Sequence, residues 1–398
     1  DLWKDYGRRI SEERKLPEGT ADTYVAGFRA ALQKHQGDTA TVAKEAGLVT
    51  HVETLEDFRK RIAEVVGTDP EHGSFRQIHF GDYLRAVDRD KAKQKDADQS
   101  KVALIVVQGE IVDGVGEANQ AGGDVIADLL DEARRDEEVL AVVLRIDSPG
   151  GSAWASEQIR RQVKALRADG KPVVASMGTV AASGGYWVAM DADRIYAHDT
   201  TVTGSIGIFG MIPTIDQPLG KLGVHTDGVG TTPLAGAFRI DRPLSADVSA
   251  IFQSQVEKGY HDFVTGVAEG RKLDVAKVQS IAEGRVWSGE DAKSLGLVDE
   301  FGGLTEASNE AAKLAGLDAG TWSLEEFRPR PDFPVHLLAQ LFGSAQIRAA
   351  TFGALDPVWQ ALQKTDLQAW LSRFNDRRGV YAHCMCTPSP GGVRATAR

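Results

Sequence analysis

Long apolar runs and cysteines are both scarce in this sequence of 398 residues. A helix needs a run of about 18 apolar residues to cross a bilayer, and no such run occurs, so no segment is predicted to span a membrane. Only two cysteines are present, Cys384 and Cys386. With His383 they could suggest a metal site, but such a site usually takes four ligands and no second pair stands nearby. We therefore expect a thiol pair in the tail, with no metal and no cofactor.

An excess of positive charge is also missing. The formal net charge is −11, and the charges are spread along the chain, which argues against nucleic acid as a partner. The sequence begins at Asp1 rather than Met, and no signal peptide is visible at its start. A chain of this length can hold about two to three domains and bury a large core.

A serine followed by two glycines is the most informative feature that is present. Ser183 lies in the run 179–187, which reads TVAASGGYW. Gly184 and Gly185 permit a tight turn from a strand into a helix. Such a turn places the hydroxyl at a helix N-terminus, where free N–H groups can receive an oxyanion. This pattern fits a nucleophilic serine, although a lone Ser-Gly-Gly is more often a structural turn.

The segments before Ser183 predict one βαβ unit. Residues 140–146 form an apolar run typical of a buried parallel strand, and residues 172–177 predict the next strand. The turn at Gly150-Gly151 opens the helix between them. Two strand ends of one βαβ unit meet at the same crevice of an α/β sheet, so the N–H groups of Gly151 and Gly184 could form an oxyanion hole. A simple helix entry is the alternative explanation of the Gly-Gly pair.

Three motifs carry a resemblance to a known family: 147–151 (DSPGG), 181–186 (AASGGY) and 203–207 (TGSIG). Together they resemble the second half of the signal peptide peptidase A (protease IV) family, of the double-length type, and the likeness runs through nearly the whole chain. The resemblance implies an α/β fold with a crotonase-like, Clp-related core. It also implies a serine endopeptidase with a Ser/Lys dyad that degrades cleaved signal peptides.

The same resemblance implies roles and partners. Ser183 matches the nucleophile, Ser205 matches the serine that hydrogen-bonds the lysine, and Gly151 and Gly184 match the oxyanion-hole positions. The implied partners are peptide substrates, further copies of the chain in a tetramer, and the bacterial inner membrane. The family works on the periplasmic side of that membrane, and its anchor would lie in an N-terminal part that this sequence does not include.

An internal repeat divides the chain. We expect residues 1–70 to be the helical tail of a first copy that has lost its core, and 101–318 to be a complete second copy. Residues 71–100 are then a charged linker. Residues 319–398 form a C-terminal region whose apolar stretch at 330–372 predicts core-covering helices or a subunit contact. The matching segments are 3–6 with 260–263, 14–16 with 271–273, and 43–49 with 292–298.

The general base is not evident in the sequence. A dyad serine needs a neutral lysine, and in double-length family members the lysine comes from the first copy. The matching place in the second copy, residues 229–234 (VGTTPL), has no lysine. We therefore expect this chain to be a fragment or processed form that holds the nucleophile without its base. Lys171 and Lys221 remain conceivable substitutes, although both have the setting of solvated surface lysines.

Two other function classes stay open. A Clp-type Ser/His/Asp protease places its histidine about 25 residues after the serine, where Ile208 stands. His198 is nearer, but it follows a short predicted strand and is expected in a surface turn. A crotonase-type acyl-CoA enzyme needs paired glutamates at the crevice, and only Glu157 is close in sequence. A non-catalytic scaffold is the remaining alternative.

Overall fold

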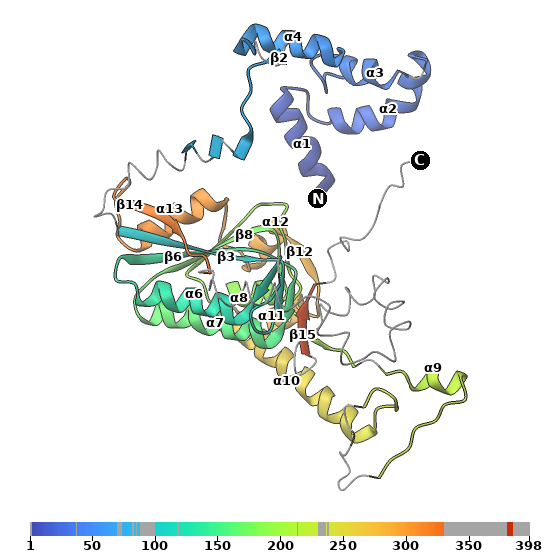
Figure 1. Ribbon diagram of the computed structural model, residues 1–398, viewed down its shortest axis with the longest axis vertical. Helices are drawn as coiled ribbons and strands as arrows, with labels where there is room; N and C mark the ends of the chain where they lie inside the picture. The colour runs from blue at the N-terminus through green and yellow to red at the C-terminus, as the bar shows by residue number, and fades with distance from the viewer. Residues whose placement is uncertain are drawn as a thin grey trace. The chain divides into compact units, whose positions relative to one another are not determined.

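The computed structural model describes residues 2–36, 38–69, 74–81, 83–84, 86–87, 100–117, 119–212, 214–229, 236, 239–329 and 380–384. The chain divides into two compact units, Asp1–Asp98 and Gln99–Arg398. Figure 1 colours the first unit in blue and the second from cyan to red.

The first unit is helical and has almost no core of its own. Its elements are α1 (Leu2–Arg14), α2 (Thr20–Lys34), α3 (Thr39–Glu45), α4 (Leu55–Val66), β1 (Thr68–Asp69) and β2 (Ser74–Phe75). Helices α3 and α4 begin at side-chain caps, because Asp38 accepts from the N–H groups of the first turn and Thr54 does the same. Among its described residues, the buried hydrophobic side chains are Ala21 and Val42.

The second unit is centred on a mainly parallel sheet. Its strands are β3 (Ser100–Gln108), β6 (Val139–Ser148), β8 (Val173–Ala182), β9 (Arg194–Ala197), β10 (Val202–Gly204), β12 (Val286–Ser288), β13 (Glu300–Phe301) and β14 (Trp322–Glu326). They run in the order β12-β10-β8-β6-β3-β14, and β9 pairs with β8 and β13. The pairings from β14 to β10 are parallel, and β12 is antiparallel to β10.

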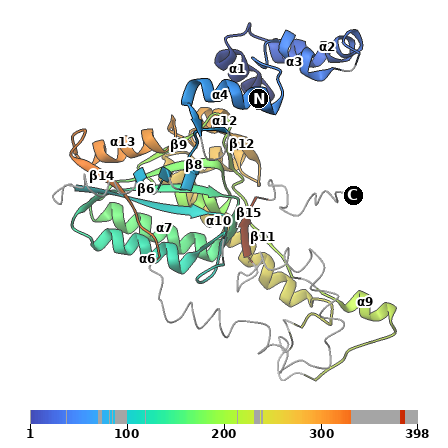
Figure 2. The same cartoon turned by 45° about the horizontal axis from the view of Figure 1, so that its top comes forward.

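Helices cover both faces of this sheet. Helices α6 (Gly123–Arg135) and α7 (Ala153–Ala168) pack together on one face, and α13 (Leu304–Leu314) lies on the other, as Figures 1 and 2 show. Side chains alternate between the faces along each strand. Ile105 and Leu144 join the larger core cluster with α6 and α7, whereas Leu104 and Val143 join Ala311 of α13. The α/β class with βαβ units is therefore confirmed.

The other described helices of the second unit are α8 (Gly184–Ala189), α9 (Asp216–Lys221), α10 (Ala246–Arg271), α11 (Val275–Ile281) and α12 (Gly289–Leu295). Residues 245–315 are mainly helical, through α10 to α13, but strand β12 lies among these helices and pairs antiparallel with β10. A strand of three residues is too short to carry a periodic pattern.

A second, smaller sheet lies beside the first. Its strands are β4 (Glu110–Val112), β5 (Gln120–Gly122), β7 (Gly150–Ser152), β11 (Phe209–Gly210) and β15 (Val380–His383). The order is β11-β15-β7-β4-β5, and β15 is antiparallel to both of its neighbours. The turn expected at Gly150-Gly151 is thus also a short strand.

The two segments that the sequence pairs as a repeat make similar local contacts. Lys15 and Lys272 both follow a helix and both have a φ of 54°. Arg14 Nε donates to the carbonyl oxygen of Gly47 at 3.3 Å, and the equivalent Arg271 Nε donates to that of Gly296 at 3.4 Å. Each of these glycines ends its helix at a positive φ and faces a leucine side chain: Leu16 in the first unit and Leu273 in the second.

Several expectations fall on residues that the structure does not describe. These are the amphipathic stretch 330–372, the middle of the linker, and Cys386. Cys384 is described, and it is buried and disulfide-bonded. The expected free thiol is therefore wrong for this residue.

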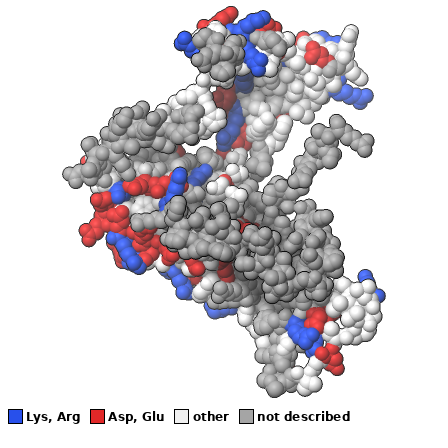
Figure 3. Space-filling view, in the orientation of Figure 1, with Lys and Arg blue, Asp and Glu red and all other residues white. Residues whose placement is uncertain are grey.

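Carboxylate and cationic side chains are mixed where α6 and β14 lie, on the face drawn in Figure 3. Lys101 sits among three carboxylates, at 2.6 Å from Glu138, 3.6 Å from Glu325 and 3.7 Å from Asp136. The hydrogen bond to Glu138 raises the pKa of Lys101 above its ordinary value. Among the described residues on this face, no continuous basic patch is seen.

Candidate functional site

Ser183 lies at the turn where strand β8 passes into helix α8. Its backbone has a φ of 55° and a ψ of −114°, a conformation that L-residues seldom adopt. Two hydrogen bonds hold it there: the Ser183 N–H donates to the Gly204 carbonyl at 2.8 Å, and the Trp187 N–H donates to the Ser183 carbonyl at 2.8 Å. The residue is 1% exposed. Such a fixed and strained position is typical of a functional side chain.

Ser205 follows the strand beside Ser183. Strands β8 and β10 are in parallel register, with Ala182 opposite Gly204, so the two serines leave the sheet next to each other. Ser205 also has a positive φ, 49°, and its N–H donates to the Arg285 carbonyl at 2.7 Å. The structure therefore brings together the two serines that the motifs singled out.

The Gly-Gly pair packs directly against the start of α8. A Cβ atom built on Gly150 would lie 2.5 Å from the Gly184 nitrogen, so only glycine fits. The Gly150 N–H is engaged by Ser148 Oγ at 3.1 Å. Gly151 packs closely against the backbone of Ile111 in strand β4. The N–H of Gly184 belongs to the first turn of a helix, where backbone donors lack an intrahelical acceptor.

The substitute bases named from the sequence lie away from Ser183. Lys171 precedes β8, whose 10 residues separate it from the serine; a strand of that length spans about 33 Å. Its Nζ donates to the carbonyl oxygens of Ala133 and Asp136 at 3.1 and 2.6 Å, so it is not the solvated lysine expected. Burial lowers the pKa of Lys171 below its ordinary value. Its amine nevertheless hydrogen-bonds the carbonyl oxygens at the end of α6 and not a serine.

Lys221 and His198 are equally unsuited to act as the base. Lys221 ends helix α9 and is exposed. His198 is exposed too, and it follows β9, which pairs with the first half of β8. Continuing that register places His198 opposite Gly178, about 17 Å along the strand from Ser183. The expectation that His198 lies in a surface turn agrees with this exposure.

Comparisons with known proteins agree with these motifs. The model of Peptidase family S49 matches residues 165–318. Protease 4 of Haemophilus influenzae is 39% identical over 393 residues, which cover 97% of this chain and 62% of that protein. A relative from Synechocystis sp. is 36% identical over 238 residues, which cover 60% of this chain and 83% of the relative. The chain belongs to peptidase family S49.

This S49 chain spans about 62% of the length of the Haemophilus Protease 4 that it matches. Among solved structures, a ClpP1 mutant from Listeria monocytogenes is 15% identical with a TM-score of 0.34, covering 52% of this chain and 94% of that chain.

The sequence of this S49 chain did not reveal a part-buried polar network that contacts helix α8, the helix that follows Ser183. Trp187 donates its indole N–H to Glu157 at 2.9 Å, and Arg160 pairs with the same carboxylate at 2.8 Å. Arg160 also reaches Asp191 at 2.6 Å. Burial raises the pKa of Glu157, but the bond from Trp187 and the charge of Arg160 outweigh it, and the net pKa lies below its ordinary value. Glu157 is thus an ionised anchor for α8 and not one of a pair of catalytic acids.

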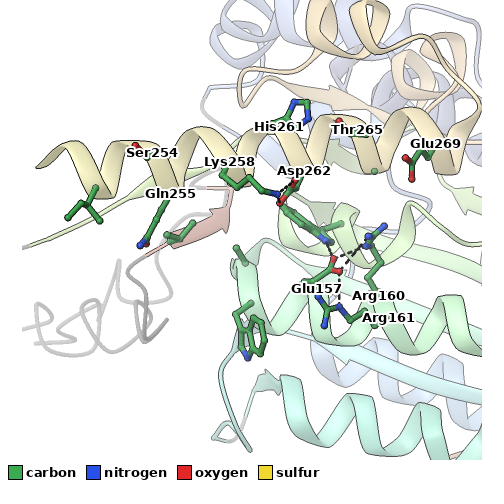
Figure 4. Close-up of a pocket in the computed structure, with 17 residues that line it drawn as sticks. Glu157, Arg160, Arg161, Ser254, Gln255, Lys258, His261, Asp262, Thr265 and Glu269 are labelled. Atoms are coloured by element: carbon green, nitrogen blue, oxygen red, sulfur yellow. Dashed lines mark hydrogen bonds and ion pairs between the residues drawn. The ribbon is translucent and has the colours of Figure 1, made fainter. Parts of the chain in front are cut away.

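The network forms one wall of a cavity of about 840 Å³ between α7 and α10. Figure 4 shows Glu157, Arg160 and Arg161 on the α7 side, facing Lys258, Asp262 and the rest of α10. Trp187 and Val380 also line it, so the cavity lies between the helix that follows Ser183 and strand β15. Sequence reasoning gave no signal for it, because its walls come from distant segments.

Among the described residues, no helix has the length and apolar character that a membrane crossing requires. No cluster of three or more potential metal ligands occurs among them either.

Proposed function

We propose that this chain is the nucleophile-bearing part of a serine endopeptidase with a Ser/Lys dyad. The observation that carries the proposal is Ser183 at a strained strand-to-helix turn, beside Ser205 and against a Gly-Gly loop. Membership of peptidase family S49 supports it. The substrates proposed are cleaved signal peptides and other membrane-associated peptides, as the family resemblance implies.

The chemistry assigns one step to each group. The Ser183 hydroxyl oxygen attacks the scissile carbonyl carbon while its proton passes to a neutral lysine amine. The oxygen of that carbonyl becomes an oxyanion and accepts from the N–H groups of Gly151 and Gly184. The lysine then gives the proton to the leaving amine, and water hydrolyses the acyl-enzyme by the same route in reverse. Ser205 would orient the lysine amine.

The lysine is proposed to come from a first-copy segment of a longer protein. Lys171, Lys221 and His198 are all poorly placed for the role, which supports this division of the dyad. A tetramer of such chains on the periplasmic side of the bacterial inner membrane, held there by an anchor, is proposed with it. The Clp-type alternative is weakened by the register of His198.

Substitution of the two serines tests the proposal in a protein that includes the first-copy segment. Ser183→Ala should reduce peptide hydrolysis by several orders of magnitude, because the nucleophile is lost. Ser205→Ala should weaken turnover without abolishing it, because that hydroxyl only positions the base. Ser280→Ala is the matched control, since Ser280 is exposed and bonds only to the Lys277 carbonyl among the described residues. Undiminished cleavage by Ser183→Ala would remove the proposal.

The divided dyad has its own test. Residues 1–398 alone should be nearly inactive, and adding a lysine-bearing first-copy polypeptide should restore cleavage. Cleavage by the chain alone at the rate of the longer protein would show that the base lies within it. Alanine substitutions at Lys171, Lys221 and His198 would then identify that base.

A further inference from the structure

The two glycines proposed as oxyanion donors lie at the starts of different helices. Gly151 belongs to β7, which leads directly into α7, and Gly184 is the first residue of α8. An oxyanion can accept from both N–H groups only if their positions are held to within about 0.5 Å. The contacts between the first turns of α7 and α8 therefore decide how well such a hole can work.

Close packing sets part of this separation. Ser156 in the first turn of α7 is fully buried, and its hydroxyl donates to the Ser152 carbonyl at 2.8 Å. A Cβ atom built on Gly184 would lie 2.6 Å from Ser156 Oγ, so the two helix starts touch there. Such a contact resists closer approach, whereas the dispersion attraction of a single contact is too weak to prevent the helices from moving apart.

A hydrogen bond to a charged group, one turn further along, resists that separation. Trp187 in α8 is 4% exposed and donates its indole N–H to Glu157 in α7 at 2.9 Å. The carboxylate is held in turn by Arg160 at 2.8 Å and by Arg161 at 3.0 Å, both on its own helix, as Figure 4 shows. A bond to an ionised acceptor is roughly twice as strong as one between neutral groups.

Trp187 transmits this restraint to the serine. Its backbone N–H donates to the Ser183 carbonyl at 2.8 Å, so one residue is bonded both to the backbone of the proposed nucleophile and to α7. Its ring also packs on Phe263 of α10, with 4.4 Å between the ring centroids. The φ of 55° and ψ of −114° at Ser183 are costly, and such a conformation persists only where its surroundings fix it.

We propose that Glu157 and Trp187 are positioning residues for the oxyanion hole, because their hydrogen bond holds the Gly184 N–H at a fixed place relative to the Gly151 N–H. This inference rests on the proposed function. Both side chains act through the backbone of α8 and not through contact with the substrate. They therefore affect the step that forms the oxyanion more than the binding of the peptide.

Trp187→Phe tests the bond, because it removes the indole N–H and keeps an aromatic ring against Phe263. In a protein that includes the first-copy segment, kcat for a peptide should fall by about 10- to 100-fold, since a lost oxyanion donor costs about 10²–10³ and a displaced one costs less. KM should stay nearly the same, because the lost interaction acts in the transition state. Trp322→Phe is the matched control: Trp322 is part-buried on β14, at an edge of the sheet, and kcat should not change.

A double-mutant cycle tests whether the two residues act as a pair. Glu157→Leu removes the acceptor, and Arg160 keeps Asp191 as a partner at 2.6 Å. The double variant with Trp187→Phe should be no slower than the slower single variant, because both changes remove the same bond. Losses that multiply would show independent effects and would overturn the pair. Circular dichroism checks the fold, and Trp187→Phe alone decides if Glu157→Leu does not fold.

An inhibitor distinguishes positioning from a general loosening of the fold. A peptide boronate bonds to the serine oxygen and presents an oxygen where the oxyanion forms, whereas an unmodified peptide of the same sequence does not. Trp187→Phe should weaken boronate binding by about the factor by which it lowers kcat, and leave binding of the unmodified peptide unchanged. Equal weakening of both ligands, or of neither, would overturn the positioning role.

Failure of this proposal can be told apart from failure of the proposed function. Cleavage that depends on Ser183, with an unchanged kcat in Trp187→Phe, would refute the positioning role and leave the peptidase standing. Cleavage that survives Ser183→Ala would refute the peptidase, and the positioning role with it.

Discussion

At the residue scale, the site depends on positions that tolerate one residue type. Ser183 holds a positive φ without being glycine, and Gly150 and Gly184 approach each other too closely for a side chain. The motifs singled out Ser183, Gly151 and Gly184 from the sequence, and the oxyanion role of the two glycines stays a prediction. Glu157 was noticed in the sequence, but its role was not foreseen, because its partners Trp187 and Arg160 meet it only after α7 and α8 have packed.

Glu157 should make stability depend on pH in a defined direction. Its folded-state pKa lies below the ordinary value, so its contribution is present above the unfolded pKa, about 4.3, and is lost as pH falls through the folded pKa. Glu157→Gln should therefore lower the free energy of unfolding at pH 7 and have a smaller effect near pH 3. Urea unfolding at both pH values measures this.

The exposed Glu117 provides the control for this comparison. Glu117→Gln should leave the free energy of unfolding nearly unchanged at both pH values. A cost of Glu157→Gln that grows as the pH falls would contradict the assigned ionised state.

At the element scale, long strands and helices were predictable and short ones were not. Strands β3, β6 and β8 and helices α6 and α7 carry apolar periods long enough to recognise. Strands β7, β11 and β15 have two to four residues each, and only their partners make them strands. The site was therefore predicted as a serine and a loop, without the small sheet that lies beside them.

The repeated arginine offers a prediction at this scale. Arg271 has a side chain that is 6% exposed and pairs with Asp299 at 2.5 Å, while the equivalent Arg14 is exposed. Arg271→Ala leaves the part-buried Asp299 without that partner and should cost about 3–5 kcal/mol of unfolding free energy. Arg14→Ala should cost below about 1 kcal/mol. Equal costs in thermal or urea unfolding would contradict the difference in burial.

At the scale of the whole molecule, the two units differ in how much they bury. Positions that are core in the second unit are open in the first: Phe263 is 0% exposed and its equivalent Tyr6 is 58% exposed, and Val298 is 3% exposed where Val49 is 39% exposed. The sequence echo predicted the helices but gave no measure of this difference.

Separate fragments of the two units should differ in how cooperatively they unfold. Residues 99–398 should unfold cooperatively on heating, because their main core cluster is large and continuous. Residues 1–98 should bind the dye ANS and lack a sharp transition, because exposed apolar surface and loose packing mark such states. Circular dichroism and ANS fluorescence of the two fragments measure this. A cooperative, dye-free transition in residues 1–98 would show that the first unit needs no covering partner.

The position of β15 also has a consequence for the order of folding. It lies between β7 and β11 but comes after every other described element in the chain. Contacts between residues so distant in sequence form late, and domains begin to fold while synthesis continues at about 5–20 residues per second. The parallel sheet can thus be complete while the small sheet still lacks the strand that lies between β11 and β7. Each newly made chain passes through an interval in which the Ser183 turn is formed while the facing edges of β7 and β11 are still unpaired.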